Sequence, residues 1–282
     1  MTVPHFETSK DGPAPANVLC ERPIPLQKDA LRRRIYAPQA YAAVRNVAVV
    51  PIVHSECGEL ASWFPLVWRR GQERNEFVAV RALLNDQRAQ PPAARGLLPL
   101  ILHAYPFVLD PNQPAGPNTQ RMLDDVFADA PTDVGASITT VHLKLSRATT
   151  SRFRMLDRFT HEAAITAEIS QAVAELDVLD PWALKFDIDE HRVEIPDLLV
   201  IRPSAFDDGR LSPLLEKYGM PCAQMLGLHR ISLFRAGVLL SMAKAFFRDN
   251  RDVTHDDGRD AGAHRRPEHH VAIDTHGAPT QS

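Results

Sequence analysis

The stretch Ser151–Leu176, with the sequence SRFRMLDRFTHEAAITAEISQAVAEL, carries a long periodic pattern. Its apolar side chains recur at spacings of three, four or multiples of these, which is the period of one face of an α-helix. These side chains are Leu156, Phe159, Ala163, Ile169, Val173 and Leu176. The pair Asp180-Pro181 follows, as is typical just beyond a helix end. We therefore expect a helix over 151–176 that turns one apolar face to a core.

The chain before this helix consists of short elements separated by turns and loops. β-Branched and apolar runs predict strands at Asn46–Val53, Leu66–Trp68, Glu76–Leu84 and Phe107–Leu109. Short helices are predicted at Glu56–Trp63, Leu97–Ala104 and Gln120–Ala128. The first two of these helices stop at an aromatic residue before proline, because a residue in that position leaves the α region.

The chain after the long helix adds more strands and two further helices. The segments Trp182–Ile188 and Arg192–Ile195 predict a hairpin around an acidic turn, and Leu198–Ile201 predicts another strand. Helices are predicted at Leu211–Tyr218 and at Gln224–Arg248. The last helix places Leu228, Ile231, Phe234, Val238, Met242 and Phe246 on one face. Strands in groups, with helices inserted as blocks, predict an α+β fold with a mostly antiparallel sheet.

Composition separates both ends of the chain from this domain. The 282 residues include 32 Lys and Arg and 35 Asp and Glu, which gives a formal net charge of -3. Residues 1–23 are rich in proline and residues 249–282 are rich in His, Asp and Arg, so we expect both to be disordered. One domain over 24–248 remains, and the 248 residues before the tail are balanced in charge. That balance argues against nucleic-acid binding through bulk positive charge.

Cysteine usage and hydropathy predict a cytoplasmic location. The 3 cysteines are widely spaced and form no CxxC pair, which is typical of a reducing compartment and argues against a zinc ribbon. The first residues lack the basic-then-apolar order of a signal peptide. The most apolar segment, Leu226–Phe247, still contains a histidine and three basic residues. We therefore expect an amphipathic helix there and no membrane span.

Three groups of polar residues have the residue types of catalytic or metal sites. His54-Ser55-Glu56-Cys57 holds nucleophile, base and acid types, but adjacency in sequence does not place them together in space. The acids over Asp187–Glu194 lack the glycine of a calcium loop, and we expect a solvated hairpin tip. Tail residues could ligate Zn or Ni, but a tail of this composition offers no ordered surroundings. Those residues are His264, His269, His270, Asp274 and His276. With the common nucleotide-binding motifs absent as well, we predict no metal site and no cofactor.

Two aromatic-proline corners remain as candidates for function. They are Trp63-Phe64-Pro65-Leu66-Val67-Trp68 and His103-Ala104-Tyr105-Pro106-Phe107-Val108. Helix-to-strand corners with aromatic side chains in the core explain both patterns. The alternative is an aromatic-lined groove for a peptide or protein partner. That groove would be formed by Trp63, Phe64, Pro65, Trp68, Tyr105, Pro106 and Phe107.

The order of these corners resembles the SapC family over roughly residues 25–248. The residues that carry the resemblance are Glu56, Phe64-Pro65-Leu66-Val67, Asn75-Glu76-Phe77-Val78, Leu98-Pro99 and Tyr105-Pro106-Phe107. Leu179-Asp180-Pro181-Trp182 is similar to the family's second half, and Leu226–Ser241 to its closing helix. Two segments depart from the family. The Pro- and Ala-rich Gln90–Gly96 stands where the family usually has a Trp, and Thr132–Arg152 also differs.

The resemblance implies a bacterial cytoplasmic protein near a surface-layer export or nutrient-uptake system. Members of the family are named for a component linked to surface-layer protein export. From this we expect a non-enzymatic accessory or binding protein with a protein or peptide partner. The alternative is an enzyme of unidentified class with a polar cleft around His54, Glu56 and His103. Convergence of these groups in a cleft would favour the enzyme, and side chains that point apart or lie in the core would count against it.

Overall fold

The computed structural model describes most of the predicted domain. It covers residues 20–260 apart from 28–29, 72–73, 111–112 and 114–118, with the backbone alone over 252–260. Residues 1–19 of the expected leader and 261–282 of the expected tail lie outside the described residues. Contacts divide the chain into two units, Met1–Phe246 and Phe247–Ser282.

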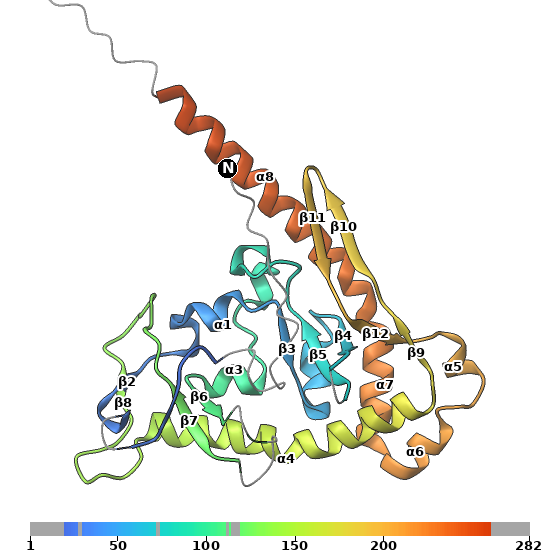
Figure 1. Ribbon diagram of the computed structural model, residues 1–282, viewed down its shortest axis with the longest axis horizontal. Coiled ribbons are helices and arrows are strands. Elements are labelled where there is room, and N and C mark those ends of the chain that lie inside the picture. Colours follow the sequence, from blue (N-terminus) through green and yellow to red (C-terminus); the bar gives the residue numbers. More distant parts are fainter. Residues whose placement is uncertain (1–19, 28–29, 72–73, 111–112, 114–118, 261–282) are drawn as a thin grey trace, which may run out of the picture. The chain divides into compact units, whose positions relative to one another are not determined.

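The largest sheet has five antiparallel strands in the order β3-β5-β4-β12-β9 (Figure 1). The strands are β3 (Val49–Pro51), β4 (Leu66–Arg69), β5 (Glu76–Val80), β9 (Leu179–Pro181) and β12 (Leu198–Ile201). Between β4 and β5, Trp68 lies opposite Phe77 and Leu66 opposite Ala79. Both strands are buried over most of their length, which explains why they read as apolar runs without polar alternation.

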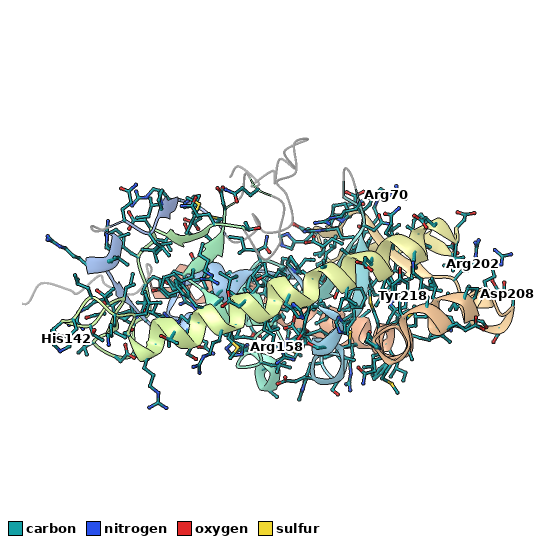
Figure 2. The ribbon with its side chains drawn as sticks, turned by 90° about the horizontal axis from the view of Figure 1, so that it is seen from below. Arg70, His142, Arg158, Arg202, Asp208 and Tyr218 are labelled. Atoms are coloured by element: carbon teal, nitrogen blue, oxygen red, sulfur yellow. The ribbon has the colours of Figure 1, made fainter. Side chains whose placement is uncertain are left out.

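Helix α4 (Arg147–Glu175) runs along the sheets and connects the parts of the core (Figure 1). Its first turn is capped by Ser146, whose Oγ accepts the amide of Thr149 across 3.2 Å, so the helix begins before the predicted Ser151. Figure 2 shows its length from below, with His142 beyond one end and Tyr218 near the other. The predicted apolar face is confirmed. Its buried members Leu156, Phe159, Ile169 and Val173 belong to three different hydrophobic clusters.

A second antiparallel sheet, in the order β1-β7-β6, consists of β1 (Pro23–Pro25), β6 (Phe107–Leu109) and β7 (Arg121–Asp124). Strand β7 corrects the prediction of a helix over Gln120–Ala128. Its backbone pairs on both sides, whereas an isolated helix of nine residues would be marginal because helix nucleation is costly. Pro23, which the sequence assigned to the disordered leader, belongs to strand β1 and pairs with Asp124.

Shorter elements fill the rest of the domain. The helices are α1 (Ala42–Asn46), α2 (Cys57–Leu60), α3 (Leu100–Ala104), α5 (Ser204–Asp207) and α6 (Ser212–Tyr218). The 3-10 turns are η2 (Ala30–Arg32), η3 (Pro38–Ala40), η4 (His54–Glu56), η5 (Gln87–Ala89) and η6 (Pro92–Ala94). Strands β2 (Arg34–Ile35) and β8 (Ala136–Ser137) pair with each other. The predicted hairpin is confirmed as β10 (Leu184–Ile188) and β11 (His191–Ile195). The fold is therefore α+β with antiparallel sheets, as predicted.

The single helix predicted over Gln224–Arg248 is three elements. They are α7 (Met220–Ser232), the 3-10 turn η7 (Leu233–Arg235) and α8 (Ala236–Asp260). The six apolar residues predicted to share one face of this helix therefore do not form a single buried surface, and two of them, Ile231 and Phe234, are exposed. Instead α7 buries His229 and Ser232, because His229 Nδ1 donates to the Leu66 carbonyl across 2.6 Å and Ser232 Oγ accepts the Leu66 amide across 2.9 Å. Helix α8 also continues into the segment predicted to be a disordered tail from 249.

None of the helices within the described residues has the combination of length and hydropathy that crossing a bilayer requires.

Candidate functional site

The first aromatic-proline corner lies inside the core. Phe64, Pro65 and Trp68 are buried, and only Trp63 is exposed, at 38%. The Trp68 ring packs against the Phe77 ring at a centroid distance of 5.0 Å. Its Nε1 donates to Oγ of Ser170 across 3.1 Å, which satisfies the polar atom of a buried indole. This corner therefore fixes β4 against α4.

The second corner lies in a different part of the core. The Tyr105 ring meets the Tyr41 ring edge-on at 5.0 Å, and Phe107 meets Phe153 at 4.8 Å. Pro106 is also buried, and the Tyr105-Pro106 peptide bond is cis. Phe64 and Trp68 belong to one hydrophobic cluster, while Tyr105 and Phe107 belong to two others. The corners thus do not form a common surface groove in this structure.

Glu56 is the last residue of η4, and its buried side chain reaches the first residue of α3. Its Oε2 accepts the Val53 amide across 3.0 Å, and its Oε1 accepts the Leu100 amide across 2.6 Å. Burial raises the pKa of this carboxyl group to about 7, although the hydrogen bonds from the two backbone amides act to lower it. Both oxygens are engaged in joining two backbone segments, so the carboxylate has a structural role.

The other residues of the predicted polar cleft do not converge with Glu56. His54 Nδ1 lies 3.1 Å from Oγ1 of Thr166, and burial lowers the His54 pKa. His103 is exposed on α3, where burial of part of its ring lowers its pKa while Glu59 opposes the shift. No hydrogen bond joins His54, Glu56 and His103 to one another, although the single cleft of the enzyme alternative would bring them together.

Ser55 and Cys57 complete the polar group. Ser55 Oγ donates to Glu162 and accepts from Arg158 Nη2 across 3.0 Å, while Arg158 also pairs with Glu162 at 2.9 Å. Burial raises the pKa of the Cys57 thiol to about 12, which leaves little nucleophilic thiolate at neutral pH. Arg158 lies on the solvent side of α4 (Figure 2), so Ser55, Arg158 and Glu162 form a hydrogen-bond network at the protein surface.

The predicted hairpin tip carries its acids on exposed positions. Lys185 Nζ and Glu194 Oε2 form an ion pair across the two strands at 3.2 Å, and Asp187 lies opposite Arg192 in the register. In the part of the chain that the structure describes, no three His, Cys, Asp or Glu residues are grouped so as to hold a metal ion. The tail histidines lie outside that part.

An apolar stripe runs along the solvent side of α7 and η7. Its residues recur at spacings of three and four and are all exposed: Met220, Ala223, Gly227, Ile231 and Phe234. Ile231 is 60% exposed and Phe234 is 61% exposed. A Cβ atom added at Gly227 would meet nothing within 4 Å, so the middle of the stripe is open. We call these five residues the α7 stripe.

The α7 stripe continues into a solvent-open hollow between α5, α6 and α7. The hollow has a volume of about 560 Å³ and shares Ala223 and Gly227 with the stripe. Its other lining residues are mostly apolar: Ala205, Phe206, Gly209, Leu211, Ser212, Leu215 and Leu226. The stripe and the hollow together form a continuous apolar surface on this side of unit Met1–Phe246.

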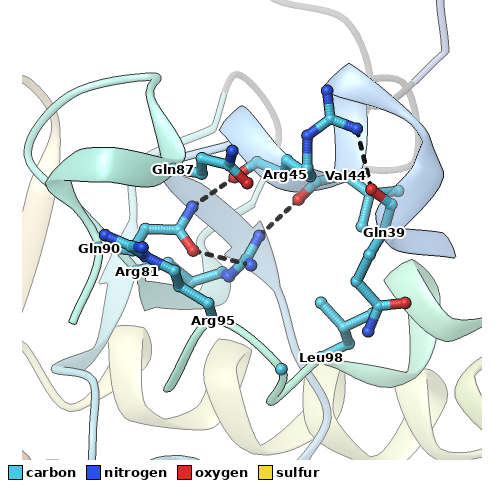
Figure 3. A pocket seen from close by; sticks show the side chains of 9 residues that line it. Gln39, Val44, Arg45, Arg81, Gln87, Gln90, Arg95 and Leu98 are labelled. Carbon is cyan, nitrogen blue, oxygen red and sulfur yellow. Dashed lines mark hydrogen bonds between the residues drawn. The ribbon is translucent and has the colours of Figure 1, made fainter. Parts of the chain in front are cut away.

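A second hollow has the opposite chemical character (Figure 3). Its volume is about 450 Å³, including space open to solvent. Three arginines and three glutamines line it, with no acidic side chain among the lining residues: Gln39, Val44, Arg45, Arg81, Gln87, Gln90, Arg95, Gly96 and Leu98. We call it the Arg81 pocket.

Sequence reasoning missed both surfaces. Arg81 stands in the run FVAVRALL of residues 77–84, and a charge within an apolar run was an available signal of a buried polar site. The residues of the α7 stripe recur at spacings of three and four, and the same spacing is typical of a helix face that packs against a core. The period alone cannot decide which of two adjacent faces is buried.

Comparisons with known proteins give one match. The family model described as SapC matches residues 31–217, which is more than half of the chain. No curated protein and no solved structure matches.

Proposed function

The chain belongs to the SapC family, and we propose that it is a non-enzymatic accessory protein that binds a partner protein through the α7 stripe. The observation that carries this proposal is the exposure of Ile231 and Phe234. Transfer of an aliphatic or aromatic side chain from water to a buried site is favourable by about 1.5–3 kcal/mol. A partner that covers a row of such exposed side chains would therefore gain binding free energy. Contiguous exposed apolar surface of this kind marks interaction sites.

The partner that we propose presents an acidic amphipathic helix. Ala223 and Gly227 in the middle of the stripe leave room for the backbone of a second helix, while Met220 and Phe234 supply larger contacts at its ends. Residues 220–246 contain three basic residues and no acidic residue. This charge favours an acidic partner and opposes a basic one. Recognition of an apolar helix face by a groove uses the same spacing of three and four residues.

The setting that we propose is bacterial and cytoplasmic, beside a protein-export or nutrient-uptake system. This part of the proposal rests on what the family is named for. It predicts that the bound protein belongs to such a system.

A site-specific crosslinking experiment tests the proposal. A photoreactive amino acid replaces Phe234 in one version of the full chain and Val141, which is 94% exposed outside α7, in the control version. In cells that naturally express the protein, we expect position 234 to yield one protein adduct that position 141 does not yield. Mass spectrometry should place the crosslink on an acidic amphipathic segment. Equal labelling from both positions, lipid adducts or adducts of a second copy would each contradict the proposal.

A further inference from the structure

Arg81 is a buried cation without a buried anion. It follows β5 and is 1% exposed, yet no carboxylate of the described residues lies within ion-pair distance of it. Burial of an unpaired charge costs several kcal/mol, so buried guanidinium groups normally have an anionic partner. Burial lowers the pKa of Arg81 to about 10, which still leaves it charged at neutral pH.

The hydrogen bonds of Arg81 only partly satisfy it. Nη1 donates to the carbonyls of Val44 and Val47 across 2.9 and 3.3 Å, and Nη2 donates to Oε1 of Gln90 across 3.1 Å. The carbonyl contacts are those of a helix C-terminus, since α1 ends at Asn46. Nε is buried and has no hydrogen-bond partner. A role as a helix cap therefore explains some of its donors and leaves both Nε and the charge unexplained.

The surroundings of Arg81 are arranged as a positive site. Gln90 is also 1% exposed, and its Nε2 donates to the Arg45 carbonyl across 2.6 Å, so its amide is held at both ends (Figure 3). Arg45 lines the wall and pairs with Asp129, which does not line the pocket. Arg95 lies exposed at the pocket with a hydrogen bond to the Arg88 carbonyl at 3.3 Å.

We propose that the Arg81 pocket binds a small oxyanion, the carboxylate or phosphate group of a small molecule, with Arg81 as the anchoring residue. A bound oxyanion would supply the missing charge and accept hydrogen bonds from donors that the protein leaves unused. Arginine is well suited to this task because its planar donors match the oxygens of both groups. The site is separate from the α7 stripe, so either proposal can fail without the other.

The test uses thermal denaturation and calorimetry of the full chain with inorganic phosphate and with succinate, at constant ionic strength set by sodium chloride. We expect one of the two anions to raise the melting temperature saturably. The anion that does so identifies the ligand class as phosphate or carboxylate. If neither shifts the wild type beyond the chloride control, the proposal is wrong.

Substitutions locate the response. Gln90→Glu places a carboxylate beside Arg81 and should remove the anion response by supplying the counterion internally. Arg81→Gln should weaken binding about tenfold or more, the equivalent of one hydrogen bond to a charged group. Arg95→Gln changes an exposed residue and should weaken binding without unfolding the protein, whereas Arg210→Gln, outside the pocket, should leave binding unchanged. If the response survives in Gln90→Glu and Arg95→Gln, the anion binds elsewhere and the proposal is overturned.

Discussion

The hydroxyl group of Tyr105 donates a hydrogen bond to Oδ2 of Asp124 across 2.7 Å, and both residues are buried. The same carboxylate accepts the amide of Arg22 at Oδ1 across 2.6 Å and the amide of Glu21 at Oδ2 across 3.2 Å. One side chain of β7 thus holds Tyr105, two residues before β6, and the segment just before β1. These segments are far apart in sequence, so the hydrogen bonds define the local tertiary structure.

The first prediction concerns this contact. Tyr105→Phe removes one donor and leaves a buried carboxylate less satisfied, so we expect a loss of about 1–3 kcal/mol in the free energy of unfolding. Urea denaturation measures this loss. Tyr36→Phe is the matched control, since the Tyr36 hydroxyl makes no hydrogen bond within the described part of the chain, and it should change stability by less than about 0.5 kcal/mol. Equal effects of the two changes would contradict the assignment.

The second prediction is a pH dependence from His229. Burial lowers its pKa from 6.5 to about 4, and its neutral ring donates to the Leu66 carbonyl and accepts the Ile201 amide. Because the folded-state pKa is the lower one, the stabilising contribution is complete above pH 6.5 and is lost as the pH falls toward 4. The maximum slope for one proton is about 1.4 kcal/mol per pH unit.

The variant His229→Gln isolates this effect. The wild type should be the more stable protein at neutral pH, and its advantage should shrink on acidification to pH 4.5, as measured by urea denaturation at each pH. An advantage that stays constant over this range would show that His229 does not titrate as described.

The third prediction concerns Glu56, whose effect has the opposite sign. Burial raises its pKa from 4.5 to about 7, so its contribution to stability is complete below pH 4.5 and is lost as the pH rises through 7. Glu56→Gln removes this titration and turns an amide NH₂ toward one of two backbone donors. We expect the variant to be less stable than the wild type at pH 4.5, with a smaller difference at pH 8. A difference that grows with pH would contradict this prediction.

The fourth prediction separates folding from partner binding at the α7 stripe. Gly227→Gln adds a side chain where a Cβ meets nothing within 4 Å, in the interior of α7. Helix propensity predicts that the protein gains up to about 1 kcal/mol of stability. The added side chain should also hinder the close approach of a second helix. We expect thermal denaturation to show a more stable protein and crosslinking from position 234 to decrease.

A control on the same helix completes this test. Gln224→Ala changes an exposed residue of α7 outside the stripe, and crosslinking from position 234 should be unaffected. If Gly227→Gln leaves crosslinking at the wild-type level, close helix packing is not the mode of binding.

The helix α4, which has a long sequence pattern, was predicted correctly, whereas the short strand β7 was not. The periodicity of α4 extends over many turns, so Leu156 and Ile169 were assigned correctly to the core. The four residues of β7 are too few to show a period, and their pairing with two distant strands decides their conformation. The inward direction of His229 was unpredictable for a different reason. Polar residues are expected outside unless their partners are known, and the Leu66 carbonyl is supplied by tertiary structure.

For the candidate sites too, the sequence alone was sufficient for some conclusions, while others depend on tertiary structure. The order of the aromatic-proline corners was sufficient to recognise the family, yet Tyr105 and Trp68 serve the core. The Arg81 pocket is assembled from η3, α1, the residue that follows β5, and the turns η5 and η6 with the residues after them, so no contiguous motif contains it. Only the charge of Arg81 within an apolar run hinted at the site.

Helix α4 has a consequence for how the domain unfolds. Its residues Leu156, Phe159 and Ile169 each belong to a different hydrophobic cluster, so no cluster can separate from the others while this helix stays intact. Such shared membership favours cooperative, all-or-none melting over stepwise loss of parts. The tertiary packing around Trp68 and that around Tyr105 are thus expected to disappear together, as one thermodynamic unit.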